Sequence, residues 1–264
     1  MPQLSEIYLD VSDSDRNVEF YVETLGMRLV DENDRSDYSL SYESGAKLKL
    51  RQRKESARYD PTVQDAYWKI GISIADVDIA REQLLKQNIE VTQPQQFLDI
   101  GYLCHFDDPD GYCIELLQHR FESNHRPRPP VESEPLGNKP IIGQVSLNVA
   151  SIEDSLAFYR DRLGLNLLSR QKVPSRGFTL YFLGDCEEKP PSDDVDAVEI
   201  REWLWQLRST VLELRAFDDD VSDFTAHPPD SELGFRGIGF TNTEAELALK
   251  DPDGVDIFAL RKDV

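Results

Sequence analysis

Short stretches in which apolar and polar residues alternate recur along the chain, and they predict half-buried β-strands. In residues 4–11 Ile7 and Leu9 point to one face, and Glu6 and Tyr8 point to the other. The same alternation returns in 69–74 and in 144–149. Each of these strands precedes apolar residues at helical spacing, which predicts helices in 14–25, 76–85 and 151–163.

Two local motifs occur twice and divide the chain into similar halves. Phe-Tyr followed by Leu-Gly stands at residues 20–26 and again at 158–164, an offset of 138 residues. Asp-Pro-Asp-Gly, a tight turn, stands at 108–111 and again at 251–254, an offset of 143 residues. The sequence therefore predicts an internal repeat of about 140 residues.

Each half divides again into units of one strand, one helix and three strands. Further strands are expected near 27–31, 37–43, 46–53, 89–93, 101–106, 112–118, 235–241 and 246–250. The fold class is therefore α+β, with tandem βαβββ modules.

The third and fourth modules depart from this length. The third has 49 residues from Gly164 to Glu213, including a polar loop at 186–196 and a helical turn near 197–205. The fourth has only 14 residues from Gly237 to Asp251, so we expect it to lack its helix and one strand.

The proline-rich stretch between the halves predicts the domain organisation. We expect one domain of two modules at 1–120, an exposed linker at 121–139, and a second domain of one full and one shortened module at 140–264.

Net charge and cysteine content limit the expected partners and the expected compartment of the protein. A formal net charge of −21 would repel nucleic acid and anionic membrane surfaces. There is no apolar run of about 18 residues, so we expect no membrane span, and the first residues lack the pattern of a secretory signal, so we expect none. Three cysteines without a CxxC motif fit reduced thiols, so we expect a cytoplasmic protein.

The two repeated motifs, set in strand–helix–three-strand units, resemble the vicinal oxygen chelate superfamily, which includes glyoxalase I, extradiol dioxygenases and bleomycin-resistance proteins. The C-terminal half, above all residues 155–214, is most similar to glyoxalase I. The resemblance implies that two modules form a cleft, in which His, Gln or Glu side chains from the first and last strands hold a divalent metal ion. The matching first-strand residues are Glu6, Lys69, Gln144 and Gly237, and the last-strand residues are Lys49, Glu115, Glu213 and Phe258.

These substitutions point away from a metal ion. A protonated lysine has no lone pair and repels a dication, and no histidine occupies any of the eight positions. An extradiol dioxygenase, which needs two histidines and a carboxylate on iron, is therefore not expected. The six polar residues lie opposite the apolar faces of their strands, so we expect them to line one concave polar surface.

Three pairings of the modules stay open. If the first pairs with the second, Glu6, Lys49, Lys69 and Glu115 form either a salt-bridged cluster that replaces the metal or four independent surface charges. If the third pairs with the fourth, Gln144 and Glu213 face Gly237 and Phe258. If the second pairs with the third, Lys69, Glu115, Gln144 and Glu213 come together, and Glu115 or Glu213 is a candidate catalytic base.

Alternate cations on one strand suggest a ligand of the opposite charge. Lys47, Lys49, Arg51 and Arg53 share one face, and with Lys69 they could attract an anionic small molecule. Ion pairing with Glu6, Asp10 and Glu115 across the sheet is the structural alternative.

Three function classes follow from these observations. The first is a protein that binds a small, anionic metabolite without metal or another cofactor. The second is a lyase of the glyoxalase I type, acting on a glutathione hemithioacetal with zinc or nickel. The third is a non-catalytic structural or dimerisation module, and a homodimer is compatible with all three.

Overall fold

The computed structural model describes residues 2–33, 37–53, 59–62, 64–126, 135–137, 139–185, 188–218, 233–243 and 247–259. The predicted linker residues 127–134 and 138, and loop residues 186 and 187, lie outside the described residues.

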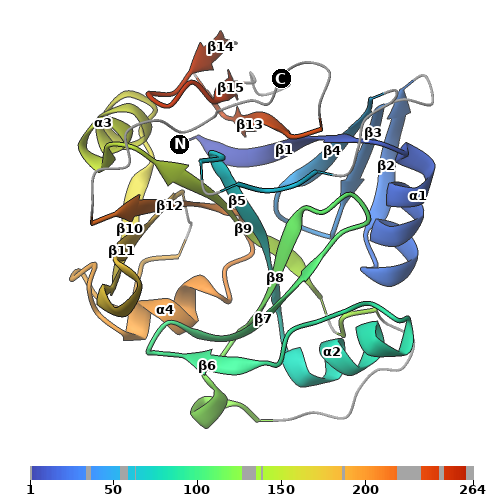
Figure 1. Cartoon of the computed structure of the whole chain (residues 1–264). Coiled ribbons are helices and arrows are strands. Elements are labelled where there is room, and N and C mark those ends of the chain that lie inside the picture. Colours follow the sequence, from blue (N-terminus) through green and yellow to red (C-terminus); the bar gives the residue numbers. More distant parts are fainter. Residues whose placement is uncertain are drawn as a thin grey trace.

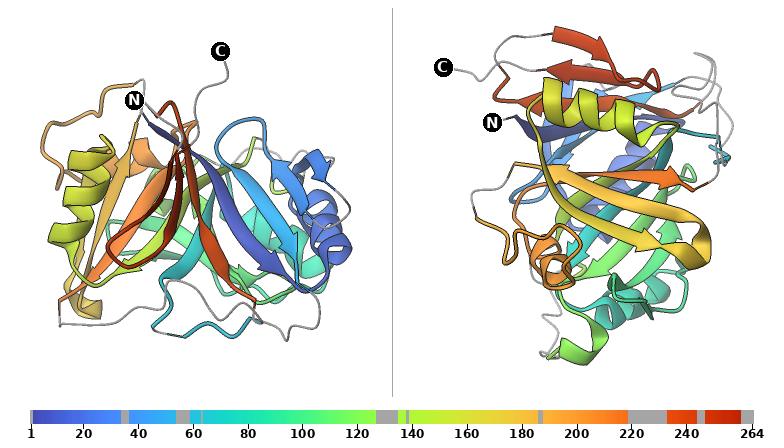
Figure 2. Two further views of the ribbon diagram at one scale, coloured as in Figure 1. Left: turned by 90° about the horizontal axis from the view of Figure 1, so that it is seen from above. Right: turned by 90° about the vertical axis from the view of Figure 1, so that its left-hand side faces the viewer.

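Two curved sheets make up the fold, with a few short helices against them (Figure 1 and Figure 2). The first sheet has seven strands in the order β14-β15-β13-β1-β4-β3-β2. Their bounds are β1 (Gln3–Val11), β2 (Arg28–Asn33), β3 (Asp37–Ser41), β4 (Lys47–Gln52), β13 (Phe235–Thr241), β14 (Leu247–Lys250) and β15 (Asp256–Ala259).

The second sheet has eight strands in the order β10-β11-β12-β9-β5-β8-β7-β6. Their bounds are β5 (Tyr67–Ile74), β6 (Gln95–Phe97), β7 (Gly101–Asp107), β8 (Cys113–Gln118), β9 (Ile141–Val149), β10 (Asn166–Val173), β11 (Phe178–Gly184) and β12 (Val211–Phe217). The α+β class with repeated modules is confirmed.

The topology decides how the modules pair. β1 of the first module lies antiparallel to β13 of the fourth, and β5 of the second lies antiparallel to β9 of the third. The pairing of the second module with the third is therefore confirmed. The two alternatives, in which the first module pairs with the second or the third with the fourth, are wrong. Each sheet takes one module from each predicted domain, while the boundaries 1–120, 121–139 and 140–264 stay a prediction.

The three longer helical segments begin at side-chain caps. The side chains of Asp13, Asp76 and Ser151 each accept a hydrogen bond from a backbone N–H in the first turn of α1 (Ser14–Glu19), α2 (Val77–Lys86) and α3 (Ile152–Leu156). α1 and α3 continue as π-helical segments η1 (Phe20–Thr24) and η3 (Ala157–Arg162). α4 (Glu199–Leu204) is the helical turn predicted in the third module, and short 3₁₀ turns lie at η2 (Glu122–Asn124) and η4 (Pro174–Arg176).

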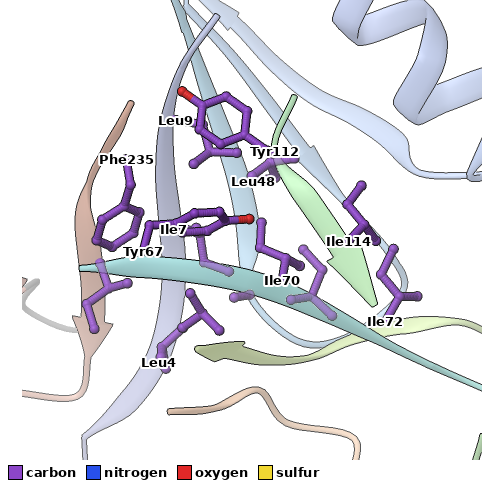
Figure 3. Close-up of a cluster of buried hydrophobic side chains, with 14 of the residues drawn as sticks. Leu4, Ile7, Leu9, Leu48, Tyr67, Ile70, Ile72, Tyr112, Ile114 and Phe235 are labelled. Atoms are coloured by element: carbon purple, nitrogen blue, oxygen red, sulfur yellow. The ribbon is translucent and has the colours of Figure 1, made fainter. Parts of the chain in front are cut away.

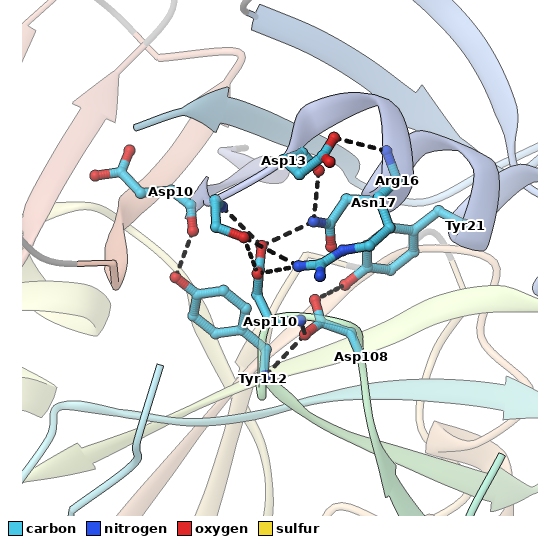
Figure 4. Close-up of polar contacts among 9 residues, drawn as sticks. Asp10, Asp13, Arg16, Asn17, Tyr21, Asp108, Asp110 and Tyr112 are labelled. Atoms are coloured by element: carbon cyan, nitrogen blue, oxygen red, sulfur yellow. Dashed lines mark hydrogen bonds and ion pairs between the residues drawn. The ribbon is translucent and has the colours of Figure 1, made fainter. Parts of the chain in front are cut away.

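The two repeated motifs meet in space through hydrogen bonds. The Tyr21 hydroxyl donates to Asp108 Oδ2 at 2.8 Å, and the Tyr159 hydroxyl donates to Asp251 Oδ2 at 2.7 Å. In both turns the other aspartate oxygen accepts two backbone N–H groups, and the glycine has positive φ. Figure 4 shows the first of these networks, which ties α1 and η1 to the turn before β8.

The apolar faces of the two sheets pack against each other and form the core. Figure 3 shows Ile7, Leu9 and Leu48 of the first sheet facing Ile70 and Ile114 of the second. All five are at most 2% exposed. The alternation that predicted the strands thus also predicts which side chains lie between the sheets.

The expected shortening of the fourth module is confirmed. β13 ends at Thr241 and β14 begins at Leu247, which leaves no room for a helix like the 10-residue α2. The strand expected near 89–93 is wrong, and the short strand β6 follows it instead. The described part of the predicted exposed linker is not uniformly exposed, because Leu136 is 2% exposed and packs in the core. None of the helices described is long and apolar enough to span a membrane.

Candidate functional site

The strand register places the eight predicted site positions at equivalent points of the two sheets. In the second sheet Gly71 lies opposite Gln144 and beside Glu115, and in the first sheet Tyr8 lies opposite Gly237 and beside Lys49. Likewise Ser146 lies between Lys69 and Glu213, and Gly239 lies between Glu6 and Phe258. The polar side chains therefore line two surfaces, one in each sheet, and the single concave surface that we predicted is wrong.

In the second sheet four charged and amide side chains form a buried cluster. Lys69 Nζ lies 2.7 Å from Glu115 Oε2 and 3.7 Å from Glu213 Oε2. Gln144 Nε2 donates to both carboxylates, at 3.1 and 3.0 Å, and the Ser146 hydroxyl donates to Glu213. All three charged side chains are at most 5% exposed, so these ion pairs operate largely out of water.

The unequal distances from Lys69 separate the two carboxyl groups. Burial alone would raise the pKa of Glu115, but the Lys69 ammonium and His105 outweigh it and hold that pKa at about 2. Burial raises the pKa of Glu213, since Lys69 is more distant and the Glu115 carboxylate adds repulsion. Burial disfavours the charged form of Lys69, yet the two carboxylates raise its pKa. The cluster thus holds Glu115 ionised and makes Glu213 the more basic of the two carboxyl groups.

A glycine makes room for this arrangement. A Cβ atom at Gly71 would lie 2.5 Å from Gln144 Cγ and 2.8 Å from Gln144 Cδ. Only a residue without Cβ lets the Gln144 side chain lie across the strand between the two glutamates.

Above the cluster lies a cavity of about 250 Å³, which we call the second-sheet cavity. The third-module insertion contributes to its wall, because Trp205, directly after α4, packs against Phe182 and donates its Nε1–H to the Ile100 carbonyl. Its apolar lining residues are Trp68, Phe97, Ile100, Leu103, Leu117, Phe178, Leu180, Phe182 and Trp205, and its polar ones are Lys69, Gln95, His105, Glu115, Gln144, Arg176, Glu213 and Arg215. The cavity is apolar around a charged floor.

His105 belongs to this site, although the sequence analysis gave it no role. Its Nε2 lies 3.0 Å from Glu115 Oε2, and it lines the cavity. The sequence could have indicated this contact. The hairpin of β7 and β8 is centred on residue 110, so His105 and Glu115, five residues to either side, pair directly. Arg215 also lines the cavity and was given no role by the sequence analysis. Its guanidinium lies 3.8 Å from the centre of the Trp68 ring, and burial lowers its pKa to about 10.

The donor set of the second sheet does not fit a divalent metal ion. Lys69 occupies a ligand position, and its ammonium, 2.7 Å from Glu115, would repel a dication. Gln144 directs its N–H groups at both glutamates, so its oxygen points away from them. Within the described residues no group of three or more His, Cys, Asp or Glu side chains is arranged to hold a metal.

The first sheet carries the other half of the predicted cluster. Lys49 Nζ lies 3.4 Å from Glu6, which also accepts the Tyr8 hydroxyl. Glu6 and Lys49 are thus separated from Lys69 and Glu115, and the predicted four-membered salt-bridged cluster is wrong. A cavity of about 540 Å³, the first-sheet cleft, is lined in part by Lys49, Arg51 and Arg53 of the predicted anion site, but not by the exposed Lys47.

Asp10 organises the arginines of the first-sheet cleft. It is fully buried, and the Nε atoms of Arg51, Arg53 and Arg236 all donate to its carboxylate, the first two at 2.8 Å. Burial would raise the pKa of Asp10, but the three arginines lower it. The ion pairs of Arg51 and Arg53 with Asp10 are the structural alternative foreseen from the sequence, and Arg236 was not foreseen.

Comparison with known proteins agrees with this architecture. The model of the Glyoxalase/Bleomycin resistance protein/Dioxygenase superfamily matches residues 3–116. A lactoylglutathione lyase of Haemophilus influenzae is 30% identical over 128 residues, which are 45% of this chain and 93% of that protein. The chain belongs to this superfamily.

Longer relatives match both halves of the chain. A lactoylglutathione lyase of Arabidopsis thaliana is 29% identical over 225 residues, covering 81% of this chain and 66% of the relative. Glyoxalase I of Saccharomyces cerevisiae is 28% identical over 217 residues, covering 69% of this chain and 62% of the relative. The chain thus spans less than two thirds of the length of these superfamily members.

Solved structures of the superfamily share the whole fold. Glyoxalase I from Zea mays superposes with a TM-score of 0.64 at 19% identity, over 99% of this chain and 92% of that one. A point variant of the maize enzyme gives 0.68 at 20% identity, over 98% and 94%. This likeness concerns the fold alone.

Proposed function

We propose that this chain binds a small metabolite in the second-sheet cavity without a metal ion. The observation that carries the proposal is the buried ion pair of Lys69 and Glu115, which occupies two of the ligand positions implied by the superfamily. The ammonium supplies the positive charge that a metal ion would otherwise place there. In this proposal Lys69 and Glu115 orient the ligand, and Glu213 is the candidate base of the alternative below.

The lining of the cavity defines the ligand class. Trp68, Phe178 and Trp205 offer aromatic surface to an apolar body. The floor already balances Lys69 against Glu115, so it favours a neutral hydroxyl or carbonyl group over another carboxylate. Arg176 and Arg215 line the same cavity and favour an anionic group on the ligand as well. Aromatic hydroxy acids and keto acids combine these features.

The absence of a bound metal in this function can be tested with one substitution. We expect purified protein, incubated with zinc or nickel and then desalted, to retain no stoichiometric ion by elemental analysis. Lys69→His removes the ammonium and adds an imidazole ligand, so it should gain metal. Lys49→His is the matched control, because Gly237 and Phe258 leave Glu6 as the one other donor among the implied positions of the first sheet. A stoichiometric ion in the unsubstituted protein would overturn the proposal.

Ligand binding is tested by calorimetry with 4-hydroxyphenylacetate, a probe with an aromatic body between a hydroxyl and a carboxylate. The matched probes are phenylacetate, which lacks the hydroxyl, and 4-hydroxyphenylacetamide, which lacks the charge. We expect the parent probe to bind most tightly and Arg176→Gln to weaken it, while Lys172→Gln, an exposed cation on β10, leaves affinity unchanged. A panel of aromatic hydroxy and keto acids in which none binds would count against the ligand class.

A second candidate is the lyase activity named in the relatives, and Glu213 favours it. Burial raises the pKa of this cavity-lining carboxyl group, which suits a group that takes up a proton. The assay is lactoylglutathione formation from methylglyoxal and glutathione, with and without added zinc or nickel. Metal-dependent turnover that Glu213→Gln abolishes would establish the lyase in place of the metal-free binder.

A further inference from the structure

The first-sheet cleft has its own charged wall, independent of the second-sheet cavity. Three guanidinium groups converge on the single buried carboxylate of Asp10. They belong to Arg51 on β4, Arg53 just after β4 and Arg236 on β13. The Lys49 ammonium lines the same cleft, so four positively charged side chains are gathered there. Because each guanidinium is anchored through Nε, its orientation is fixed before any ligand arrives.

Carboxylates line the same cleft, and they change the ligand that it would favour. Asp37 on β3 is exposed and lies directly across from Arg51 on β4. Asp31 on β2, the next strand outward, is exposed as well. Asp256, 38% exposed and paired with Lys250 at 2.6 Å, lines the cleft from β15. The arginines anchored on Asp10 therefore lie close to a second, acidic rim. A ligand with only negative charge would meet repulsion from this rim.

Aromatic rings form the third part of the wall. The rings of Tyr8 and Phe258 pack with their centroids 4.7 Å apart, and both line the cleft. Phe258 occupies one of the ligand positions implied by the superfamily, and Gly237 another. This cleft therefore offers apolar surface where a metal centre would require donor atoms.

We propose that the first-sheet cleft binds a zwitterionic α-amino acid with an apolar or aromatic side chain. Its carboxylate lies against the arginines held by Asp10, and its ammonium group faces the aspartates of the rim. The short distance between the two charges of an α-amino acid matches the cross-strand pairing of Arg51 with Asp37. Its side chain lies on Tyr8 and Phe258.

The experiment measures binding of L-phenylalanine to the full chain by calorimetry, beside two matched probes that each lack one charge. N-acetyl-L-phenylalanine has no ammonium group, and L-phenylalaninamide has no carboxylate. We expect both to bind at least tenfold more weakly than the parent amino acid. Equal binding of the acetylated probe would mean a simple anion site and would overturn the proposal. The proposal also fails if none of the twenty amino acids binds.

Variants assign the binding to this cleft. Arg51→Gln removes an anchored cation whose side chain is 48% exposed, and we expect affinity for L-phenylalanine to fall at least fivefold. Arg16→Gln is the matched control, since Arg16 is 49% exposed and pairs with the buried Asp110 outside the cleft. Asp37→Asn should weaken the binding of L-phenylalanine and leave the affinity for N-acetyl-L-phenylalanine unchanged. Equal losses in the Arg51 and Arg16 variants would refute the assignment.

Discussion

Removal of the Lys69 side-chain charge tests the buried cluster most directly. Lys69→Met keeps the length and apolar stem of the side chain, so it changes charge more than packing. The substitution leaves Glu115 and Glu213, which are 3% and 1% exposed, without their shared cation. Because loss of one partner from a buried pair costs about 3–5 kcal/mol, we expect the free energy of unfolding to fall by that amount.

The cluster also predicts an asymmetry between its two ends. Glu115→Gln leaves Lys69 with a second carboxylate, Glu213, at 3.7 Å, so the cation keeps a partner. We expect a loss of about 2 kcal/mol, close to that of one hydrogen bond to a charged group. Lys69→Met should therefore cost more than Glu115→Gln. Urea unfolding followed by circular dichroism at neutral pH measures both.

A matched substitution in the other sheet serves as the control. Lys49 pairs with Glu6 at 3.4 Å, but the two side chains are 28% and 13% exposed. Solvent screening limits such a pair to about 0–1 kcal/mol, so Lys49→Met should change stability little. Equal effects of Lys69→Met and Lys49→Met would refute the claim that the second-sheet pair is a buried, mutually dependent unit.

The pH dependence gives a second readout of the same cluster. The pKa of Glu115 is lowered to about 2, so its contribution to stability is present above its ordinary value near 4.5 and is lost as pH falls toward 2. Lys69→Met removes the main cause of that lowering. The variant should lose less stability than the unsubstituted protein between pH 5 and pH 3, both measured by urea unfolding.

Three further predictions concern residues outside the ion pair. Tyr21→Phe and Tyr159→Phe each remove a buried hydrogen bond to an Asp-Pro-Asp-Gly turn, and thermal unfolding should show similar losses of about 1–3 kcal/mol. Burial raises the pKa of Asp108 to about 7, so the stability from its protonation is complete below its unfolded value near 3.8 and is lost as pH rises through 7. Asp108→Asn should therefore flatten the decline in unfolding free energy from pH 5 to pH 8. Gly71→Ala should displace Gln144 and cost about 1–3 kcal/mol in urea unfolding, and a neutral result would contradict the close contact.

Local features of the sequence were sufficient for most of the fold. The caps at Asp76 and Ser151, and both Asp-Pro-Asp-Gly turns, depend on neighbouring residues, and the strands between them follow from alternation. Equal spacing from the turn at residue 110 would also have revealed His105 opposite Glu115. These features depend on short-range geometry, which a sequence displays directly.

The pairing of the modules could not be read in the same way. The first strands β1 and β5 have the same alternation and present the same unpaired edge, so either could accept β9 or β13. The choice depends on contacts between residues more than 70 positions apart, such as Ile70 with Val145 and Ile7 with Ile238. Arg236 was missed for this reason, since only the pairing of β13 with β1 brings it to Asp10.

Equivalent register does not produce equivalent chemistry in the two sheets. Lys69 and Lys49 both lie in the polar centre of their sheets, yet one is 5% exposed and the other 28%. Trp205, from the third-module insertion, lines the second-sheet cavity of about 250 Å³, whereas the first-sheet cleft has about 540 Å³. A buried ammonium must keep compensating carboxylates, so the second sheet is committed to its own ion pairs. The wider first-sheet cleft, with arginines anchored on one buried aspartate, can direct charge at a ligand. The ligand of each site therefore follows from the walls around it rather than from the positions that the two sheets share.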